Sequence, residues 1–197
     1  WRRERPFRAA VIEQCTYDGT IYDAGRILEK IGHLCDYLVF DEAWAGFMKF
    51  HPIYAGRFSM GLANLGPEAP GIIATQSTHK QLASFSQASQ IHVKDSHIAG
   101  QRRRIEHRRF NEFFMLHAST SPFYPLFASL DVNAKVHEGK AGEMLWDRCI
   151  ELSIEARMPV TTISSGAFCA AAGTVSALPR IPAVARCKVE MRMADLP

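Results

Sequence analysis

Lys80 ends the polar run Thr75–Lys80, which directly follows an apolar stretch of the chain. A lysine amine can form an imine with an aldehyde, and the nearby Ser77 and His79 could donate hydrogen bonds to a phosphate. Asp41 ends a second apolar stretch, and a carboxylate can hold a ring nitrogen in its protonated form. A reactive amine, a carboxylate and phosphate donors are the three groups that pyridoxal phosphate requires of a protein.

Each of these residues also has a purely structural interpretation. His79 could be a core histidine with one satisfied hydrogen bond, and Asp41 could cap a helix. A lysine also follows a histidine by chance in many sequences. From residue types alone, both interpretations stay open.

The elements that would position these residues alternate between strand and helix. Residues 7–14 predict a buried strand, and Asp23 is expected to cap a helix that runs to about Ile31 and ends at Gly32. Three further strands are predicted at residues 37–40, 71–76 and 91–93. This alternation is typical of an α/β fold with a mainly parallel sheet flanked by helices.

Ligands of such sheets gather beyond the carboxyl ends of the strands. Asp41 and the segment Ser77–Lys80 both stand at predicted strand ends. The predicted topology therefore favours a shared site for them.

From residue 108 to about residue 156 the pattern is helical. Phe110, Phe113 and Phe114 recur at helical spacing and are expected to lie in the core, and Pro122 suits the first turn of a second helix. The apolar face of that helix is expected to consist of Leu126, Leu130, Ala134 and Val136, and a third helix is expected over residues 144–156.

Beyond those elements, the sequence around Lys80 resembles a known signature. The positions concerned are Thr75, Ser77, His79, Lys80, Ala83, Ser84, Ser86, Gln87, Ala88 and Ser89. They resemble the pyridoxal-attachment signature of the bacterial ornithine, lysine and arginine decarboxylases. The blocks Phe40–Gly46 and Phe114–Pro125 resemble the same family. The resemblance covers residues 7–157, and its last block, continued to Gly139, is most similar to the ornithine branch.

The resemblance implies part of the large domain of a fold-type-I pyridoxal-phosphate enzyme. The implied reaction is decarboxylation of a basic amino acid, most simply ornithine to putrescine and carbon dioxide. Lys80 would carry the cofactor, Asp41 would pair with its ring nitrogen, and His79 is a further catalytic candidate. Ala43 would pack on the ring, Trp44 would lie near its 3-hydroxyl, and Ser77 and His79 would bind the phosphate. Ser121 would reach the phosphate of a neighbouring subunit, which implies a homodimer or a higher homo-oligomer of the full-length enzyme.

Departures from the family pattern suggest an excerpt of a longer chain. The family's upstream phosphate-binding and ring-stacking residues would precede Thr16, and residues 158–197 do not resemble the small C-terminal domain expected there. We therefore expect a partial major domain over residues 1–157 and an atypical tail over 158–197, either disordered or read from a shifted frame. The alternative function is a non-catalytic remnant, or a fragment that pairs with an intact subunit.

Composition points away from several other classes. A formal net charge of +3 and a basic run without interleaved aromatic residues (102–104, 108–109) favour a solvated face or subunit contact over a nucleic-acid partner. No apolar stretch has the length of a membrane helix, and the eight histidines form no metal-binding motif. Five unpatterned cysteines favour buried, reduced thiols and a cytoplasmic location.

Overall fold

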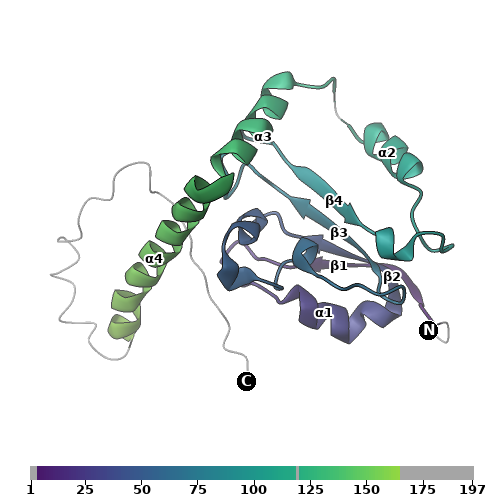
Figure 1. Cartoon of the computed structure of the whole chain (residues 1–197), viewed down its shortest axis with the longest axis horizontal. Coiled ribbons are helices and arrows are strands. Elements are labelled where there is room, and N and C mark those ends of the chain that lie inside the picture. Colours follow the sequence, from purple (N-terminus) through teal and green to yellow (C-terminus); the bar gives the residue numbers. More distant parts are fainter. Residues whose placement is uncertain (1–3, 119, 165–197) are drawn as a thin grey trace.

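The computed structural model describes residues 4–118 and 120–164 of the chain. At its centre lies a sheet in the order β1-β2-β3-β4 (Figure 1), formed by Phe7–Glu13, Cys35–Asp41, Gly71–Gln76 and Gln90–Lys94. β1, β2 and β3 are parallel, and β4 is antiparallel to β3. The prediction of an α/β fold with a mainly parallel sheet is confirmed.

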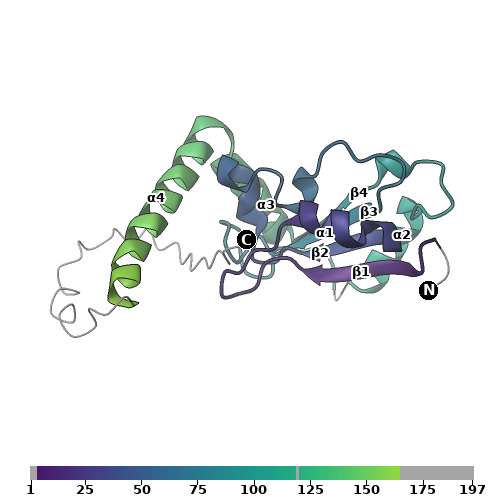
Figure 2. The same cartoon turned by 90° about the horizontal axis from the view of Figure 1, so that it is seen from below.

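Helix α1 (Ala24–Ile31) covers one face of this sheet (Figure 2). As predicted, Asp23 caps it, with its Oδ1 atom accepting a hydrogen bond from the Arg26 backbone N–H at 3.1 Å, and Gly32 follows its last residue. The apolar side of the helix packs on buried strand residues, which are Leu38, Phe40 and Ile72.

The other face of the sheet is also covered. Tyr37 and Ile73 pack there with Ile98, and Phe110 of α2 (His107–Leu116) adds to the cluster. Successive side chains of a strand point to opposite faces, so an apolar run such as 37–40 needs partners on both sides. Both faces of the sheet are therefore covered, as predicted.

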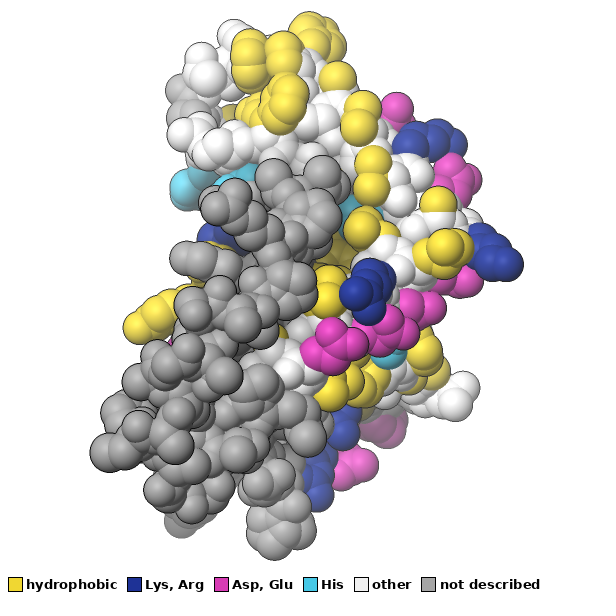
Figure 3. All heavy atoms as spheres, turned by 90° about the vertical axis from the view of Figure 1, so that its left-hand side faces the viewer, with side chains coloured by type: hydrophobic (Ala, Val, Ile, Leu, Met, Phe, Trp, Pro, Cys, Tyr) yellow, Lys and Arg dark blue, Asp and Glu magenta, His cyan; other side chains and the backbone are white. Residues whose placement is uncertain are grey.

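The prediction of a buried phenylalanine stripe on α2 is wrong beyond Phe110. Phe113 and Phe114 are 54% and 55% exposed, because only the start of α2 contacts the sheet. Figure 3 shows further hydrophobic side chains at the surface on the side of the molecule where α3 (Tyr124–Val136) and α4 (Gly139–Ser164) lie. The spacing of apolar residues predicted these helices, but it did not predict which face of each helix is buried.

Helix α3 departs from its prediction in two respects. Pro125, and not Pro122, lies in its first turn, since the helix begins two residues later than Pro122. Ala134 and Val136 are exposed, whereas Ser129 and Asn133 are its buried residues. Leu126 and Leu130 are half-buried, so the prediction of an apolar face is wrong for Ala134 and Val136 only, and the most buried side chains of α3 are polar.

Helix α4 continues through residue 157 to Ser164. It is held to the rest of the chain by Trp146, whose ring stacks on Phe47 with centroids 5.2 Å apart, and by Ile150 in the same buried cluster. The predicted change of character after residue 157 stays a prediction, and residues 165–197 lie outside the described ones.

The basic run is not a solvated face at its centre. The Arg103 guanidinium donates to the backbone oxygens of Pro67 and Ala69 at 2.6 and 2.8 Å. Arg104 forms an ion pair with the buried Asp95 at 3.2 Å. Arg108 remains exposed and pairs with Glu112. The prediction of a solvated face is therefore wrong for Arg103 and Arg104, which fix loops around the sheet.

The Asp95 carboxylate is the centre of a buried polar network. It accepts hydrogen bonds from the Tyr37 hydroxyl at 3.0 Å, from Arg104 and from His107 Nε2. Burial acts to raise the pKa of Asp95, but the hydrogen bonds from His107, Arg104 and Tyr37 outweigh it, so the pKa lies below its usual value of 3.8. Burial raises the pKa of Tyr37 to about 12.

We predict that Asp95→Asn lowers the free energy of unfolding by about 2 kcal/mol at pH 7, the size expected for hydrogen bonds to a buried charge. A carboxyl whose pKa is depressed by folding stabilises the protein above its unfolded pKa of about 4 and loses that effect as pH falls through the folded pKa. The difference between wild type and variant should therefore shrink below about pH 4. Urea unfolding at pH 7, 5 and 3 measures it, and a constant difference would contradict the assignment.

Two cysteines of the described residues, Cys15 and Cys35, are buried, as expected for inert thiols. Burial raises the pKa of Cys15 to about 11 and also raises the pKa of Cys35. Cys149 is half-buried, and Cys169 and Cys187 lie outside the described residues.

Candidate functional site

The candidate site lies where β2 and β3 end side by side. Asp41 and Thr75 are partners in the parallel register, and the Glu42 backbone N–H donates to the Thr75 oxygen at 2.9 Å. The segment that contains Asp41 and the segment that contains Lys80 therefore leave the sheet at the same edge.

Lys80 reaches across this edge to Trp44. Its Nζ atom lies 4.6 Å from the centroid of the Trp44 ring, which places the ammonium group over the aromatic face. The lysine is exposed and the tryptophan is half-buried, so the amine is accessible to a ligand. This contact joins the two segments that carry most of the predicted site residues.

Asp41 is the last residue of β2, and its side chain is exposed. Its Oδ1 atom accepts a hydrogen bond from the Ala43 backbone N–H at 3.0 Å, which stabilises a turn and not the start of a helix, so the interpretation of Asp41 as a helix cap is wrong. A carboxylate can accept several hydrogen bonds, and this single turn contact leaves acceptor capacity for a protonated ring nitrogen. Ala43 is half-buried beside it.

His79 is oriented by the loop that follows it. Its Nδ1 atom lies 2.8 Å from the Ala88 backbone oxygen. Because a carbonyl only accepts, Nδ1 must carry a proton, and Nε2 is then the ring atom that can contact a ligand. A histidine protonated on both nitrogens would donate from Nε2 to a phosphate oxygen.

The two remaining predicted residues differ in position. Ser77 is half-buried in the turn that carries Lys80, and its backbone oxygen accepts from the Lys80 N–H at 3.1 Å. Ser121 lies in the exposed connection between α2 and α3. Its predicted role across a subunit boundary stays a prediction.

Glu42 is a site residue that sequence reasoning missed. Its side chain is fully buried, with Oε1 accepting from the Ser59 N–H at 2.6 Å and Oε2 accepting from Gln76 Nε2 at 2.8 Å. Gln76 directly precedes Ser77, so this pair ties the end of β2 to the start of the turn that carries Lys80. The signal available in the sequence was an acidic residue, Glu42, directly after the acidic residue that ends the strand.

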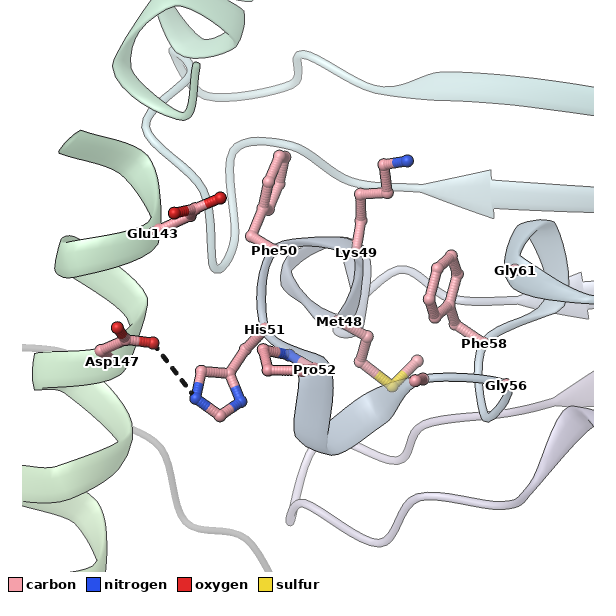
Figure 4. Close-up of a pocket in the computed structure, with 11 residues that line it drawn as sticks. Met48, Lys49, Phe50, His51, Pro52, Gly56, Phe58, Gly61, Glu143 and Asp147 are labelled. Atoms are coloured by element: carbon pink, nitrogen blue, oxygen red, sulfur yellow. Dashed lines mark ion pairs between the residues drawn. The ribbon is translucent and has the colours of Figure 1, made fainter. Parts of the chain in front are cut away.

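A separate cavity of about 620 Å³ lies between the segment after Trp44 and α4 (Figure 4). Figure 4 shows His51 and Asp147 facing each other across it, and His51 Nε2 lies 3.3 Å from Asp147 Oδ1. None of the predicted site residues lines this cavity. It belongs to the packing of α4 and not to the edge of the sheet where Lys80 lies.

The described part of the chain contains no cluster of three or more His, Cys, Asp or Glu side chains suited to a metal ion. Its helices also lack the combination of length and apolar character needed to cross a membrane. The donor set at the sheet edge instead fits pyridoxal phosphate, since it offers an accessible primary amine, a carboxylate, and imidazole and hydroxyl groups for a phosphate.

Comparison with known proteins identifies the class to which this fold and site belong. The sequence matches the family model described as Orn/Lys/Arg decarboxylase, major domain, over residues 2–176. The chain therefore belongs to the Orn/Lys/Arg decarboxylase family, a family of lyases.

Individual relatives point in the same direction. The chain is 56% identical to the constitutive ornithine decarboxylase of Escherichia coli over 79% of its length and 22% of the relative's. It is 58% identical to the ornithine decarboxylase of Haemophilus influenzae, again over 79% of the chain and 21% of the relative. The solved structure of lysine decarboxylase A from Pseudomonas aeruginosa superposes with a TM-score of 0.71 at 41% identity, covering 83% of this chain and 21% of that one. The chain thus spans about a fifth of the length of these relatives.

Proposed function

We propose that the chain takes part in the pyridoxal-phosphate-dependent decarboxylation of a basic amino acid, with Lys80 as the residue that carries the cofactor. The observation that supports this most strongly is the position of the Lys80 amine, accessible and over Trp44 at a sheet edge where Asp41 also ends its strand. Membership of a decarboxylase family supplies the reaction class.

Each residue has a separate task in this proposal. The Lys80 amine would hold the cofactor by condensing with its aldehyde, with loss of water, and would be released when the substrate amine takes its place. The Asp41 carboxylate keeps a proton on the ring nitrogen. Ser77 and His79 hold the phosphate, and Trp44 and Ala43 border the ring.

Bound pyridoxal phosphate supplies an electron-withdrawing ring that accepts the electron pair left behind when the substrate carboxylate departs as carbon dioxide. The protein must keep that ring protonated, and Asp41 does this through its negative charge. Once displaced and protonated, the Lys80 ammonium group would be an acid close to the reacting carbon, to which it could donate a proton.

Ornithine is the proposed substrate. The chain is 56–58% identical to two ornithine decarboxylases and 41% identical to the Pseudomonas lysine decarboxylase structure. Ornithine and lysine differ by one methylene, which a binding site distinguishes by roughly 10–200-fold in kcat/KM.

We therefore predict that kcat/KM for carbon dioxide release falls in the order ornithine, then lysine, then arginine, with about tenfold or more between the first two. Release from ¹⁴C-carboxyl-labelled amino acids, with pyridoxal phosphate supplied, measures all three. A preference for lysine would contradict the ornithine assignment. Cofactor bound at Lys80 without release from any of the three would favour the alternative, a non-catalytic or subunit-pairing role.

A further inference from the structure

Helix α3 buries polar side chains and exposes apolar ones. Ser129 and Asn133 are 5% and 4% exposed, whereas Phe127 and Val132 on the same helix are 54% and 57% exposed. Burial of a polar side chain costs free energy unless its hydrogen-bonding groups find partners. The partners of Ser129 and Asn133 therefore indicate what this face of α3 contacts.

Those partners belong to the loop that follows Lys80. Asn133 Oδ1 accepts a hydrogen bond from the Ala83 backbone N–H at 2.9 Å. Ser129 Oγ accepts from the Phe85 backbone N–H at 3.2 Å and donates to the Leu126 oxygen of its own helix at 2.8 Å. The Ser84 hydroxyl adds a longer contact to the Ser129 backbone oxygen at 3.4 Å. Three consecutive loop residues are thus bound to one helix.

The loop has little regular structure of its own. Between β3 and β4 its backbone is held by a few local bonds, among them Lys80 N–H to the Ser77 oxygen and Ser84 N–H to the Thr78 oxygen. Thr78 Oγ1 also donates to the Ala88 oxygen at 3.0 Å, which closes the loop on itself. The Lys80 turn is fixed upstream by the end of β3, so its downstream support comes from this closure and from α3.

We propose that Asn133 and Ser129 are positioning residues, which fix the Lys80 amine for attachment of the cofactor by anchoring the backbone at Ala83 and Phe85. The proposal rests on the proposed function, because it requires Lys80 to be the attachment residue. A displacement of about 1 Å in a reacting group can lower a reaction rate by a factor of about 10². Loss of an anchor three residues from Lys80 should therefore be measurable.

The test compares variants that differ in one acceptor atom. Asn133→Leu removes the oxygen that accepts from Ala83, whereas Asn133→Asp has a similar shape and keeps it. Ser129→Ala removes the second acceptor with little change in volume, so it remains informative if Asn133→Leu does not fold. Asp131→Ala is the matched control, since Asp131 is exposed on the same helix.

Two measurements are made, both at a temperature well below the midpoint of thermal unfolding of wild type and of each variant. The first, without cofactor, is amide hydrogen exchange at Ala83 and Phe85. The second is the pyridoxal phosphate concentration that half-saturates covalent modification of Lys80, read by borohydride reduction and peptide mass.

We expect Asn133→Leu and Ser129→Ala to accelerate exchange and to raise the half-saturating concentration about tenfold, the consequence of one lost acceptor. Asn133→Asp should restore both readouts to within a few-fold of wild type and Asp131→Ala should change neither. Faster exchange with unchanged modification of Lys80 would overturn the proposal, as would no change in either. If wild type itself takes up no cofactor at Lys80, the proposed function fails first, and the positioning role fails with it.

Discussion

Lys80→Ala is expected to abolish decarboxylation, with kcat falling by about 10³-fold or more, because the variant loses the amine that forms the covalent link to the cofactor. The fold should change little. An exposed cation–π contact such as that between Lys80 and Trp44 contributes about 0.5–1 kcal/mol. Carbon dioxide release and the thermal midpoint, measured on the same sample, separate the two effects.

The matched control is Lys30→Ala, which removes an exposed lysine from the last turn of α1. It should retain both the activity and the covalent modification of wild type. Full activity in the Lys80 variant, or equal loss in both variants, would contradict the role of Lys80 as attachment residue.

Asp41→Asn is expected to lower kcat by about 10²–10³-fold, the range seen when one preorganised electrostatic group is removed from an active site. Asparagine can still accept the hydrogen bond from the Ala43 N–H, so the turn after β2 should persist. It carries no charge, however, and cannot stabilise a proton on the ring nitrogen. Covalent modification of Lys80 should therefore continue while turnover falls.

Asp36→Asn serves as the control for Asp41. Asp36 lies on the same strand near its opposite end and pairs with the largely exposed Arg8 at 2.7 Å. Such a surface pair contributes about 0–1 kcal/mol, so the variant should be stable and fully active. Steady-state kinetics of both variants at equal cofactor occupancy make the comparison. An Asp41→Asn enzyme within a few-fold of wild type would remove Asp41 from the mechanism.

The sequence alone predicted the elements that depend on local signals. Asp23 and Gly32 bound α1 because a cap and a terminal glycine act on their own helix. The first three strands were found because β-branched and aromatic runs between turns carry their signal within a few residues. The predicted burial of the first strand is wrong, because β1 lies at the edge of the sheet and Val11 is 73% exposed. The prediction that Asp41 and Lys80 lie at the same edge of the sheet followed from the positions of these strands.

What could not be predicted depends on partners that are distant in sequence. Spacing predicted Phe113 and Phe114 as core residues, but burial of one helix face depends on what packs against it, and α2 meets the sheet only at its start. The antiparallel direction of β4 likewise had no local signal.

The positioning residues of the site were missed for a related reason. Ser129 and Asn133 of α3 and His137, which follows its last residue, recur every four residues, and all three are buried. A polar stripe at helical spacing reads as a solvated face unless its partners are known. Here those partners include backbone N–H groups of the Lys80 loop, which no residue type in the sequence reveals.

The most direct test of the central claim is to locate the cofactor on the chain. The protein is incubated with pyridoxal phosphate, reduced with borohydride, digested and mapped by mass spectrometry. We expect one modified peptide, with the added mass on Lys80, and we expect it to be lost in Lys80→Ala but not in Lys30→Ala. Modification spread over several exposed lysines, or centred on a lysine other than Lys80, would contradict it.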